Sequence, residues 1–236
     1  MPFPKLEIDC RLRPDFITSD ILGVIDSLEP FGAGNPQPMF GLFGMTLTAI
    51  QPIGGGKHLR LSFKKGNSNV TGLLFGVTEK EFPYLTGDTV DLAVRLERNE
   101  YMGQVKVSIY IKEMRMSGTD DERYLKSKRL YEKIMRRDRL NAKEARFALP
   151  DRQLIANVFR FIRDSGGWSF DTDILCYRLG GDGSDAVKVL ICIDVLCELG
   201  IFRKEGESIL AHNLHNKVNL EDSELMKYLK NEGKES

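Results

Sequence analysis

The chain has 236 residues, of which 42% are hydrophobic and 29% charged, a balance typical of folded soluble proteins. No run approaches the roughly 18 consecutive apolar residues of a membrane span, and the N-terminus lacks the apolar core of a signal peptide. The four cysteines form no C-x-x-C pair, so we expect buried free thiols in a reducing compartment. These features predict a cytoplasmic protein with no membrane partner.

The net charge is zero, but its sign varies along the chain. Residues 1–118 carry 13 Lys+Arg and 13 Asp+Glu, residues 119–163 carry 13 against 7, and residues 164–236 carry 8 against 14. A basic middle between neutral and acidic ends predicts a local surface for polyanions rather than a protein that coats DNA generally.

The first 39 residues predict a lead-in segment. Residues 6–12 alternate like a short strand, and residues 14–28 place apolar side chains at helical spacing. Thr18, Ser19 and Asp20 offer N-caps for this helix. Pro30 and the Pro/Gly-rich run that follows prevent its continuation, which predicts an entry loop.

In residues 40–116 the apolar residues recur with a period of two, which predicts β-strands. The candidate strands are residues 42–53, 57–64, 69–75, 88–98 and 104–114. The polar segment 78–85 contains Pro83 and predicts one or two helical turns at most. Three meandering strands, a short helical connection and a final hairpin match an OB-type five-stranded β-barrel. Strand count and period alone also allow other small barrels.

The second half predicts helices and a terminal hairpin, so the whole chain reads as an α+β multidomain protein. A basic helix over 122–140 lies in a predicted helical linker, residues 117–149. Helices from 151, over 173–179 and over 185–199 precede two short strands, at 201–204 and 208–212. This order predicts a winged-helix-like α/β domain over 150–218. Residues 219–236 read as a polar tail that frays, with one helical stretch near 225–230.

The entry loop carries the most distinctive run in the sequence, LEPFGAGNPQPMF at residues 28–40. It is followed by GKHLRL at 56–61 and LLFG at 73–76. Together these segments resemble the C-terminal OB region of the RecJ family, single-strand-specific DNA exonucleases of the DHH phosphoesterase superfamily. The resemblance covers about residues 5–114, and residues 119–236 are similar to the extra C-terminal region of some RecJ relatives.

The resemblance implies a role in DNA repair and recombination, with single-stranded DNA as the partner. It also implies a catalytic core that holds two divalent metals, Mg or Mn, through Asp/His clusters. This chain has only three histidines, His58, His212 and His215, and no adjacent pair. The run Gly54–His58 is not the glycine-histidine motif of that core, because Leu59-Arg60-Leu61-Ser62 follows it. We therefore expect no cofactor and no nuclease centre here, and a catalytic core N-terminal to this chain.

An OB barrel binds single strands through strands 2–3 and the loops between strands 1–2 and 4–5. The candidate DNA-binding residues on the second strand and its ends are Lys57, His58, Arg60, Lys64 and Lys65. Those around the 4–5 loop are Tyr101 at its tip, with Arg98 and Lys106 beside it. Gly54–Gly56 forms the 1–2 loop, where a phosphate can approach backbone N–H groups, or simply a flexible turn. The alternative for all these cations is an ordinary solvated strand face.

Other functions remain open for the second half. The basic helix 122–140 either follows a phosphate backbone or is a solvated connection between domains. The helix 185–199 has a single lysine, Lys188, which favours a structural or protein-docking role over DNA reading. The alternative function is thus a protein-interaction module of a DNA-repair factor, which docks through the acidic winged-helix region. The cluster Asp171, Asp173, Asp182 and Asp185 is better explained by helix capping than by a metal site.

Overall fold

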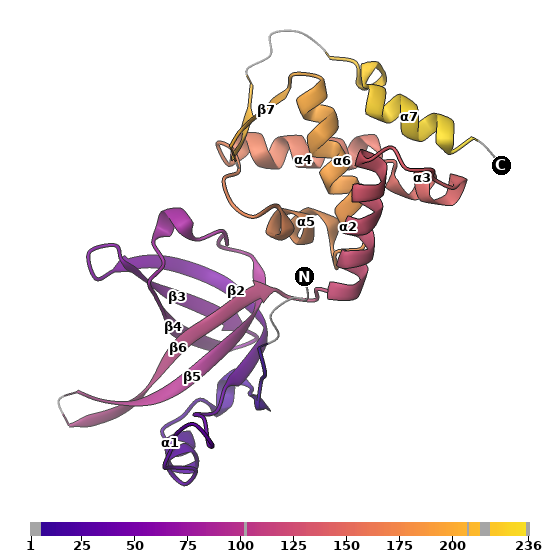
Figure 1. Ribbon diagram of the computed structural model, residues 1–236. Helices are drawn as coiled ribbons and strands as arrows, with labels where there is room; N and C mark the ends of the chain where they lie inside the picture. The colour runs from indigo at the N-terminus through magenta and orange to yellow at the C-terminus, as the bar shows by residue number, and fades with distance from the viewer. Residues whose placement is uncertain (1–5, 102, 207, 213–217, 235–236) are drawn as a thin grey trace. The chain divides into compact units, whose positions relative to one another are not determined.

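A computed structural model of the chain describes residues 6–101, 103–206, 208–212 and 218–234. Contacts divide the chain into a first unit, which ends at Ser117, and a second unit, which begins at Gly118. Long strands dominate the first unit and helices the second (Figure 1). Among the described residues, no helix combines the length and the apolar character needed to cross a bilayer.

Five long strands form the first unit because apolar and polar side chains alternate along them. They are β2 (Phe40–Ile53), β3 (His58–Lys65), β4 (Ser68–Phe75), β5 (Thr89–Tyr101) and β6 (Gln104–Met116). On β3, Leu59, Leu61 and Phe63 are buried while the residues between them face outward. The five predicted strands are confirmed, and the predicted helical turn is the short 3-10 helix η2 (Glu79–Glu81).

With β1 (Cys10–Arg11) at one edge, the strands follow the order β1-β2-β3-β4-β6-β5, and β2 also pairs with β5. Pairing therefore runs from β2 through β3, β4, β6 and β5 and returns to β2. β4 and β6 meet through the single parallel pair Leu73 and Tyr110. Close approach here depends on Gly72, because a Cβ at this position would lie 2.8 Å from Cδ1 of Ile111.

The lead-in segment consists of β1 (Cys10–Arg11), the 3-10 helix η1 (Pro14–Phe16) and α1 (Asp20–Asp26). A single helix over 14–28 is therefore wrong. Ile17 separates the two pieces, because its ψ of 74° lies outside the helical region. Ser19 is the N-cap of α1, but no side-chain hydrogen bond caps the helix.

Asn35 organises the entry loop that contains the LEPFGAGNPQP run. Its side-chain amide donates to the carbonyl of Leu28 at 2.7 Å and to that of Pro30 at 3.1 Å. Its backbone pairs in both directions with Gly32. Gln37 then donates to the carbonyl of Leu96 at 3.2 Å, which ties the loop to β5. Much of this distinctive run thus has a structural role, because it holds α1 against the sheet.

The second unit consists mainly of helices. They are α2 (Asp121–Met135), α3 (Ala142–Ala148), α4 (Arg152–Asp164), α5 (Thr172–Gly180), α6 (Ala186–Glu198), η3 (Leu220–Asp222) and α7 (Glu224–Glu232). A hairpin of β7 (Phe202–Glu205) and β8 (Ser208–Ala211) follows α6, and Trp168 bridges to Ile209 on β8. Eight residues of α6 are buried, so this helix lies at the centre of the unit's core.

Two segments differ from the predictions. The basic helix ends at Met135 rather than at 140, and its Tyr124 and Ile134 are fully buried in the core of the second unit. At the chain's end, Leu225, Met226 and Leu229 of α7 are buried in the same core. Neither α2 nor α7 therefore behaves as a solvated linker or a frayed tail, because each buries one apolar face.

Candidate nucleic-acid interface

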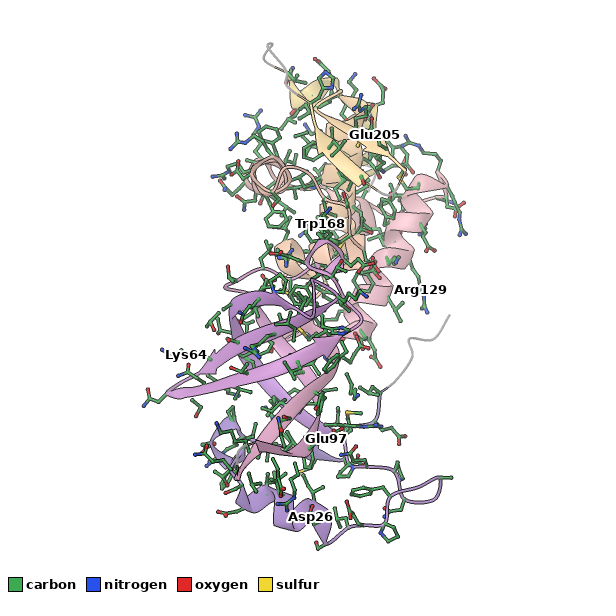
Figure 2. All side chains as sticks on the ribbon, turned by 90° about the vertical axis from the view of Figure 1, so that its left-hand side faces the viewer. Asp26, Lys64, Glu97, Arg129, Trp168 and Glu205 are labelled. Atoms are coloured by element: carbon green, nitrogen blue, oxygen red, sulfur yellow. The ribbon has the colours of Figure 1, made fainter. Side chains whose placement is uncertain are left out.

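The exposed side of β3 carries several of the predicted cations. Because Leu59, Leu61 and Phe63 point inward, alternation directs Arg60 and Lys64 to the opposite side, where both are exposed. Lys64 projects from the sheet in Figure 2. Lys57 precedes the strand and is also exposed. These three cations make no hydrogen bond or ion pair with another residue that the structure describes, so their charges are available to a ligand.

Two aromatic side chains lie beside these cations on the same side of the sheet. Phe75 on β4 is opposite His58, and its side chain is 51% exposed although it is large and apolar. The centroids of these two rings are 4.7 Å apart in an edge-to-face arrangement, and the Tyr110 ring on β6 lies 5.7 Å from Phe75. Lys112 places its ammonium 5.9 Å from the Tyr110 ring. We call His58, Phe75 and Tyr110 the aromatic row.

Phe75, Tyr110 and Lys112 were not among the residues predicted from the sequence, although the alternation of apolar and polar residues indicates their outward direction. Ile109 and Ile111 are buried, so Tyr110 between them must face outward with Lys112 two residues on. The pairing of β4 with β6 could not be predicted from the period of either strand. That pairing brings Tyr110 next to Phe75.

His58 is a hydrogen-bonded surface residue. Its Nδ1 accepts a hydrogen bond from the backbone N–H of Gly76 at 3.0 Å, and its ring is half-buried against Phe75. The three glycines in the loop before His58 are explained by the backbone conformation of that loop. Gly54, Gly55 and Gly56 have φ values of 59°, 68° and 84°, a left-handed conformation that other residues adopt only at a cost. The three glycines are therefore required by the turn itself.

Two of the predicted DNA-binding cations, Lys65 and Arg98, instead bond to other parts of the first unit. Lys65 donates to the carbonyl of Phe43 at 2.6 Å, which anchors the end of β3 to the neighbouring strand β2. Arg98 forms an ion pair at 2.5 Å with Asp26 of α1. Alternation places Arg98 on the side of β5 that faces α1, opposite to the aromatic row. Arg98 and Lys106 therefore lie on opposite sides of the sheet, and their placement on either side of the Tyr101 ring stays a prediction.

Lys106 does share a side of the sheet with the aromatic row, because it lies four residues before Tyr110 on β6. That spacing puts it about 13 Å further along the strand. The backbone of Tyr101 pairs with Gln104 at the tip of the hairpin, while its side chain lies outside the part of the structure that is described. His215 falls outside the described residues as well.

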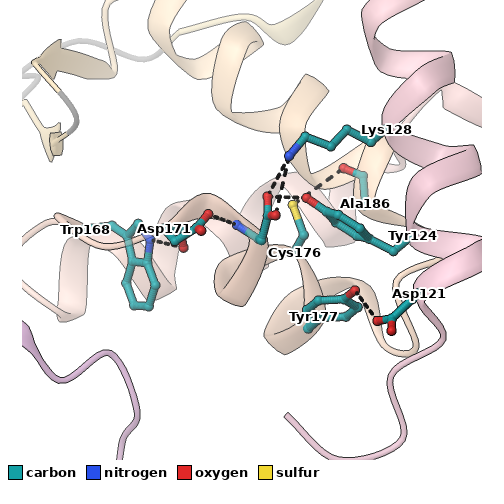
Figure 3. Close-up of polar contacts among 9 residues, drawn as sticks. Asp121, Tyr124, Lys128, Trp168, Asp171, Cys176, Tyr177 and Ala186 are labelled. Carbon is teal, nitrogen blue, oxygen red and sulfur yellow. Dashed lines mark hydrogen bonds and ion pairs between the residues drawn. The ribbon is translucent and has the colours of Figure 1, made fainter. Parts of the chain in front are cut away.

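Part of the acidic cluster of the second unit, including Asp171, is built into a polar network (Figure 3). The buried hydroxyl of Tyr124 donates to Asp173, which also accepts from Lys128 at 3.0 Å. Burial, followed by the hydrogen bond to Asp173, raises the pKa of Tyr124. Asp171 accepts from the backbone N–H of Asp173 and so caps α5. Asp171 is thus a helix cap, as predicted, whereas Asp173 is held by the side chains of Tyr124 and Lys128.

The other two carboxylates of the cluster are similarly engaged. Asp182 accepts from the backbone N–H of Ser184 and from Arg123, and these bonds lower its pKa to about 2. Asp185 pairs with Lys188 at 2.8 Å. Among the residues that the structure describes, no three His, Cys, Asp or Glu side chains come together to hold a metal. The described residues thus do not fit the two divalent ions that the RecJ resemblance implies.

The comparisons with known proteins address the first unit. Residues 8–113 match the family described as the RecJ OB domain. The first unit is a RecJ-like OB domain. The matched segment contains the aromatic row, the cations of β3 and the entry loop, so each of these features lies within the RecJ-like part of the chain.

The chain is 24% identical over 115 residues to the single-stranded-DNA-specific exonuclease RecJ of Bacillus subtilis. This match covers 48% of the chain and only 15% of the Bacillus protein. RecJ from Thermus thermophilus, solved in complex with Mg²⁺, is 26% identical over 44% of this chain and 15% of its own, with a TM-score of 0.35. The structure of the same protein in complex with Mn²⁺ is 23% identical over 45% of this chain and 16% of its own, with a TM-score of 0.33.

Proposed function

We propose that this chain is the single-stranded-DNA-binding C-terminal portion of a RecJ-like 5′→3′ exonuclease. The observation that carries the proposal is the exposed Phe75 ring, beside Tyr110 and between unpaired cations, on a RecJ-like OB domain. We infer that β2–β6 form a closed OB-type barrel whose outer face is the binding surface. The parent enzyme's catalytic core, with its divalent metal, would lie outside this chain.

The physical roles follow from the chemistry of single strands. Unpaired bases expose their π-faces, and stacking on an aromatic side chain contributes about 1–3 kcal/mol per base. Phe75 and Tyr110 offer two such rings, while Lys57, Arg60, Lys64 and Lys112 lie where phosphates of the same strand would pass. Duplex DNA keeps its bases stacked inside, so it gains only the phosphate contacts. The surface therefore favours single strands over duplexes.

Binding of the full chain to oligo(dT) tests the proposal. We expect the double variant Lys57→Ala/Arg60→Ala to bind more weakly than the parent, because it removes two phosphate contacts. The slope of log K against log salt should decrease by about 1.4, which is 0.7 for each contact to a single strand. Fluorescence anisotropy with labelled oligo(dT) at four salt concentrations measures both quantities.

The matched control is Arg13→Ala/Lys80→Ala, which removes two exposed cations of the first unit from outside β2–β6. It loses the same net charge but should keep the parent's affinity and salt slope. Equal losses in the two variants would mean that only the overall charge attracts DNA, and the assigned face would be wrong.

For the second unit we propose a winged-helix arrangement with a structural role. Helices α4, α5 and α6, the bridge at Trp168 and the β7–β8 hairpin occur in the order of that fold. A DNA-reading helix must expose side chains to base edges. Burial of most of α6 instead supports a core function, and Lys188, its single cation, pairs with Asp185.

A further inference from the structure

The second unit contains a basic groove between α2 and α3, with a volume of about 510 Å³. Five cationic side chains line it: Arg123, Lys126, Arg129, Lys133 and Lys143. One carboxylate, Glu144, is also part of the lining, and Leu130 and Phe147 supply apolar surface. The groove belongs to a unit for which the RecJ OB domain match makes no assignment, because that match ends at residue 113.

The cations of the groove are of two kinds. Lys133 donates to both carboxylate oxygens of Glu144, at 2.7 and 2.9 Å, and Arg123 pairs with Asp182 at 2.6 Å. Lys126, Arg129 and Lys143 have no hydrogen-bond or ion-pair partner among the described residues. Arg129 projects outward from α2 in Figure 2. The carboxylate of the lining is thus neutralised locally, while three positive charges remain uncompensated.

Phe147 places an aromatic ring among these cations. Its side chain is 43% exposed, which is costly for a phenyl group that could be buried. The ammonium of Lys188 lies 4.9 Å from the ring centroid, so a cation–π contact fixes the ring in the groove. A positively charged groove with an accessible aromatic ring is the combination by which proteins hold single strands.

We propose that the α2–α3 groove is a second binding site for single-stranded DNA, distinct from the sheet face of the first unit. Lys126, Arg129 and Lys143 contact successive phosphates, and Phe147 stacks against a base. Lys126 and Arg129 lie three residues apart on one face of α2, about 4.5 Å along the helix axis, and Lys143 lines the same groove from α3. This spacing of uncompensated charges suits a polymer that carries one charge in every repeat.

The alternative occupant is an acidic segment of a protein, and the groove suits it less well. An extended peptide needs a sheet edge or other unpaired backbone groups, whereas the lining comes mainly from helices whose backbone groups are satisfied internally. A docked helix needs a row of apolar anchors at helical spacing. The groove supplies two apolar side chains, Leu130 and Phe147, so the observations favour the nucleic acid.

The test uses the full chain and oligo(dT) of about 40 nucleotides, several times the site size of one single-strand-binding fold, so that the strand can reach more than one site. The variant Lys126→Ala/Arg129→Ala/Lys143→Ala should lower the slope of log K against log salt by about 2, which is 0.7 for each of three phosphates. Phe147→Leu keeps an apolar side chain but removes the ring, and we expect its affinity to fall about five-fold or more. Circular dichroism verifies that both variants are folded.

Arg152→Ala/Arg160→Ala/Arg203→Ala is the charge-matched control, since all three side chains are exposed on the same unit and outside the groove lining. It should leave the slope within the error of the parent. If the groove triple variant retains the parent's affinity and slope, the proposal is overturned. It is also overturned if that variant loses binding to poly-L-glutamate but not to oligo(dT), because the groove would then be a protein-binding site.

The same titrations separate this inference from the proposed function of the first unit. A loss of oligo(dT) affinity with Lys57→Ala/Arg60→Ala alone would support the sheet face as a binding site and refute the groove. A loss of affinity with the groove variants alone would support the groove and refute the sheet face. Losses in both sets, with reduced salt slopes in each, are the expected result.

Discussion

The two units each contain an aromatic cluster with polar neighbours, but the clusters are built in opposite ways. In the first unit, Phe75 is 51% exposed, and the unpaired charge of Arg60 lies on the same side of the sheet. In the second, Tyr124 is fully buried, and its hydroxyl donates to Asp173, which Lys128 also contacts. The comparison teaches that residue type does not identify a binding site. The first cluster is the candidate because its ring is exposed and its cations have no partner among the described residues.

The largest effect should come from the buried cluster. Tyr124→Ala removes a fully buried ring from the core of the second unit and should lower its free energy of unfolding by about 3–5 kcal/mol. The single tryptophan, Trp168, is buried in this unit, so its fluorescence during urea denaturation reports the loss. Tyr110→Ala, in the exposed cluster, should leave that transition unchanged. An equal shift for the two variants would remove the distinction between the clusters.

Phe75→Ala should have the largest effect on binding. The variant removes a ring that is half in solvent, so the first unit stays folded while affinity for oligo(dT) falls by about 1–3 kcal/mol. Val24→Ala is the matched control, because Val24 is 62% exposed on α1. Fluorescence anisotropy titrations with oligo(dT) measure the affinity of both variants. Parent-like affinity for Phe75→Ala would mean that the exposed ring has another purpose.

The same comparison explains which features could be predicted from the sequence. Alternation of apolar residues determined the strands of the first unit and the outward direction of Arg60 and Lys64, because a strand face is a local property. The entry-loop run indicated the resemblance to the RecJ OB domain, which the match over residues 8–113 confirms. Local signals also explained Asp171 as a helix cap.

Features that depend on pairing between distant segments could not be predicted. Arg98 looked like a free loop cation, but Asp26, 72 residues earlier, neutralises it. Phe75 and Tyr110 became neighbours only through the β4–β6 pairing. The polar composition after residue 219 suggested a frayed tail. Three buried side chains are enough to dock α7, but they change the average polarity of the segment too little to be noticed in its composition.

The docking of α7 should depend on pH through Glu198 at the end of α6. Its carboxylate accepts from Ser223 Oγ at 2.6 Å and from the backbone N–H groups of Glu224 and Leu225 at 2.6 and 3.3 Å. Burial acts to raise the pKa of Glu198, but the hydrogen bonds outweigh it, so the pKa lies below its ordinary value. A depressed carboxyl pKa stabilises the folded state above the unfolded pKa, about 4.3, and this stability is lost as pH falls through the folded pKa.

We therefore expect the protection of α7 amides, measured against the intrinsic exchange rate at each pH, to decrease in the parent as the pH falls below the unfolded pKa of about 4.3. Glu198→Gln removes the charge and should weaken the docking by about 0.5–1.5 kcal/mol at neutral pH, the net value of an exposed hydrogen-bonded group. The variant should also lose most of the acid dependence. Hydrogen–deuterium exchange from acid to neutral pH measures both effects, and unchanged acid dependence in the variant would assign the pH response to another group.

The smallest effect should come from Arg98, and it tests the rule that internal partners remove a cation from the binding surface. Its ion pair with Asp26 is partly exposed, so Arg98→Ala should cost about 0.2–1 kcal/mol of stability. Affinity for oligo(dT) should stay within about two-fold of the parent, a change of ~0.4 kcal/mol. Arg60→Ala, which removes an unpaired arginine from the same unit, is the direct comparison in the same titration. Equal losses for the two variants would show that Arg98 exchanges Asp26 for a phosphate, and the binding surface would then extend around β5 to α1.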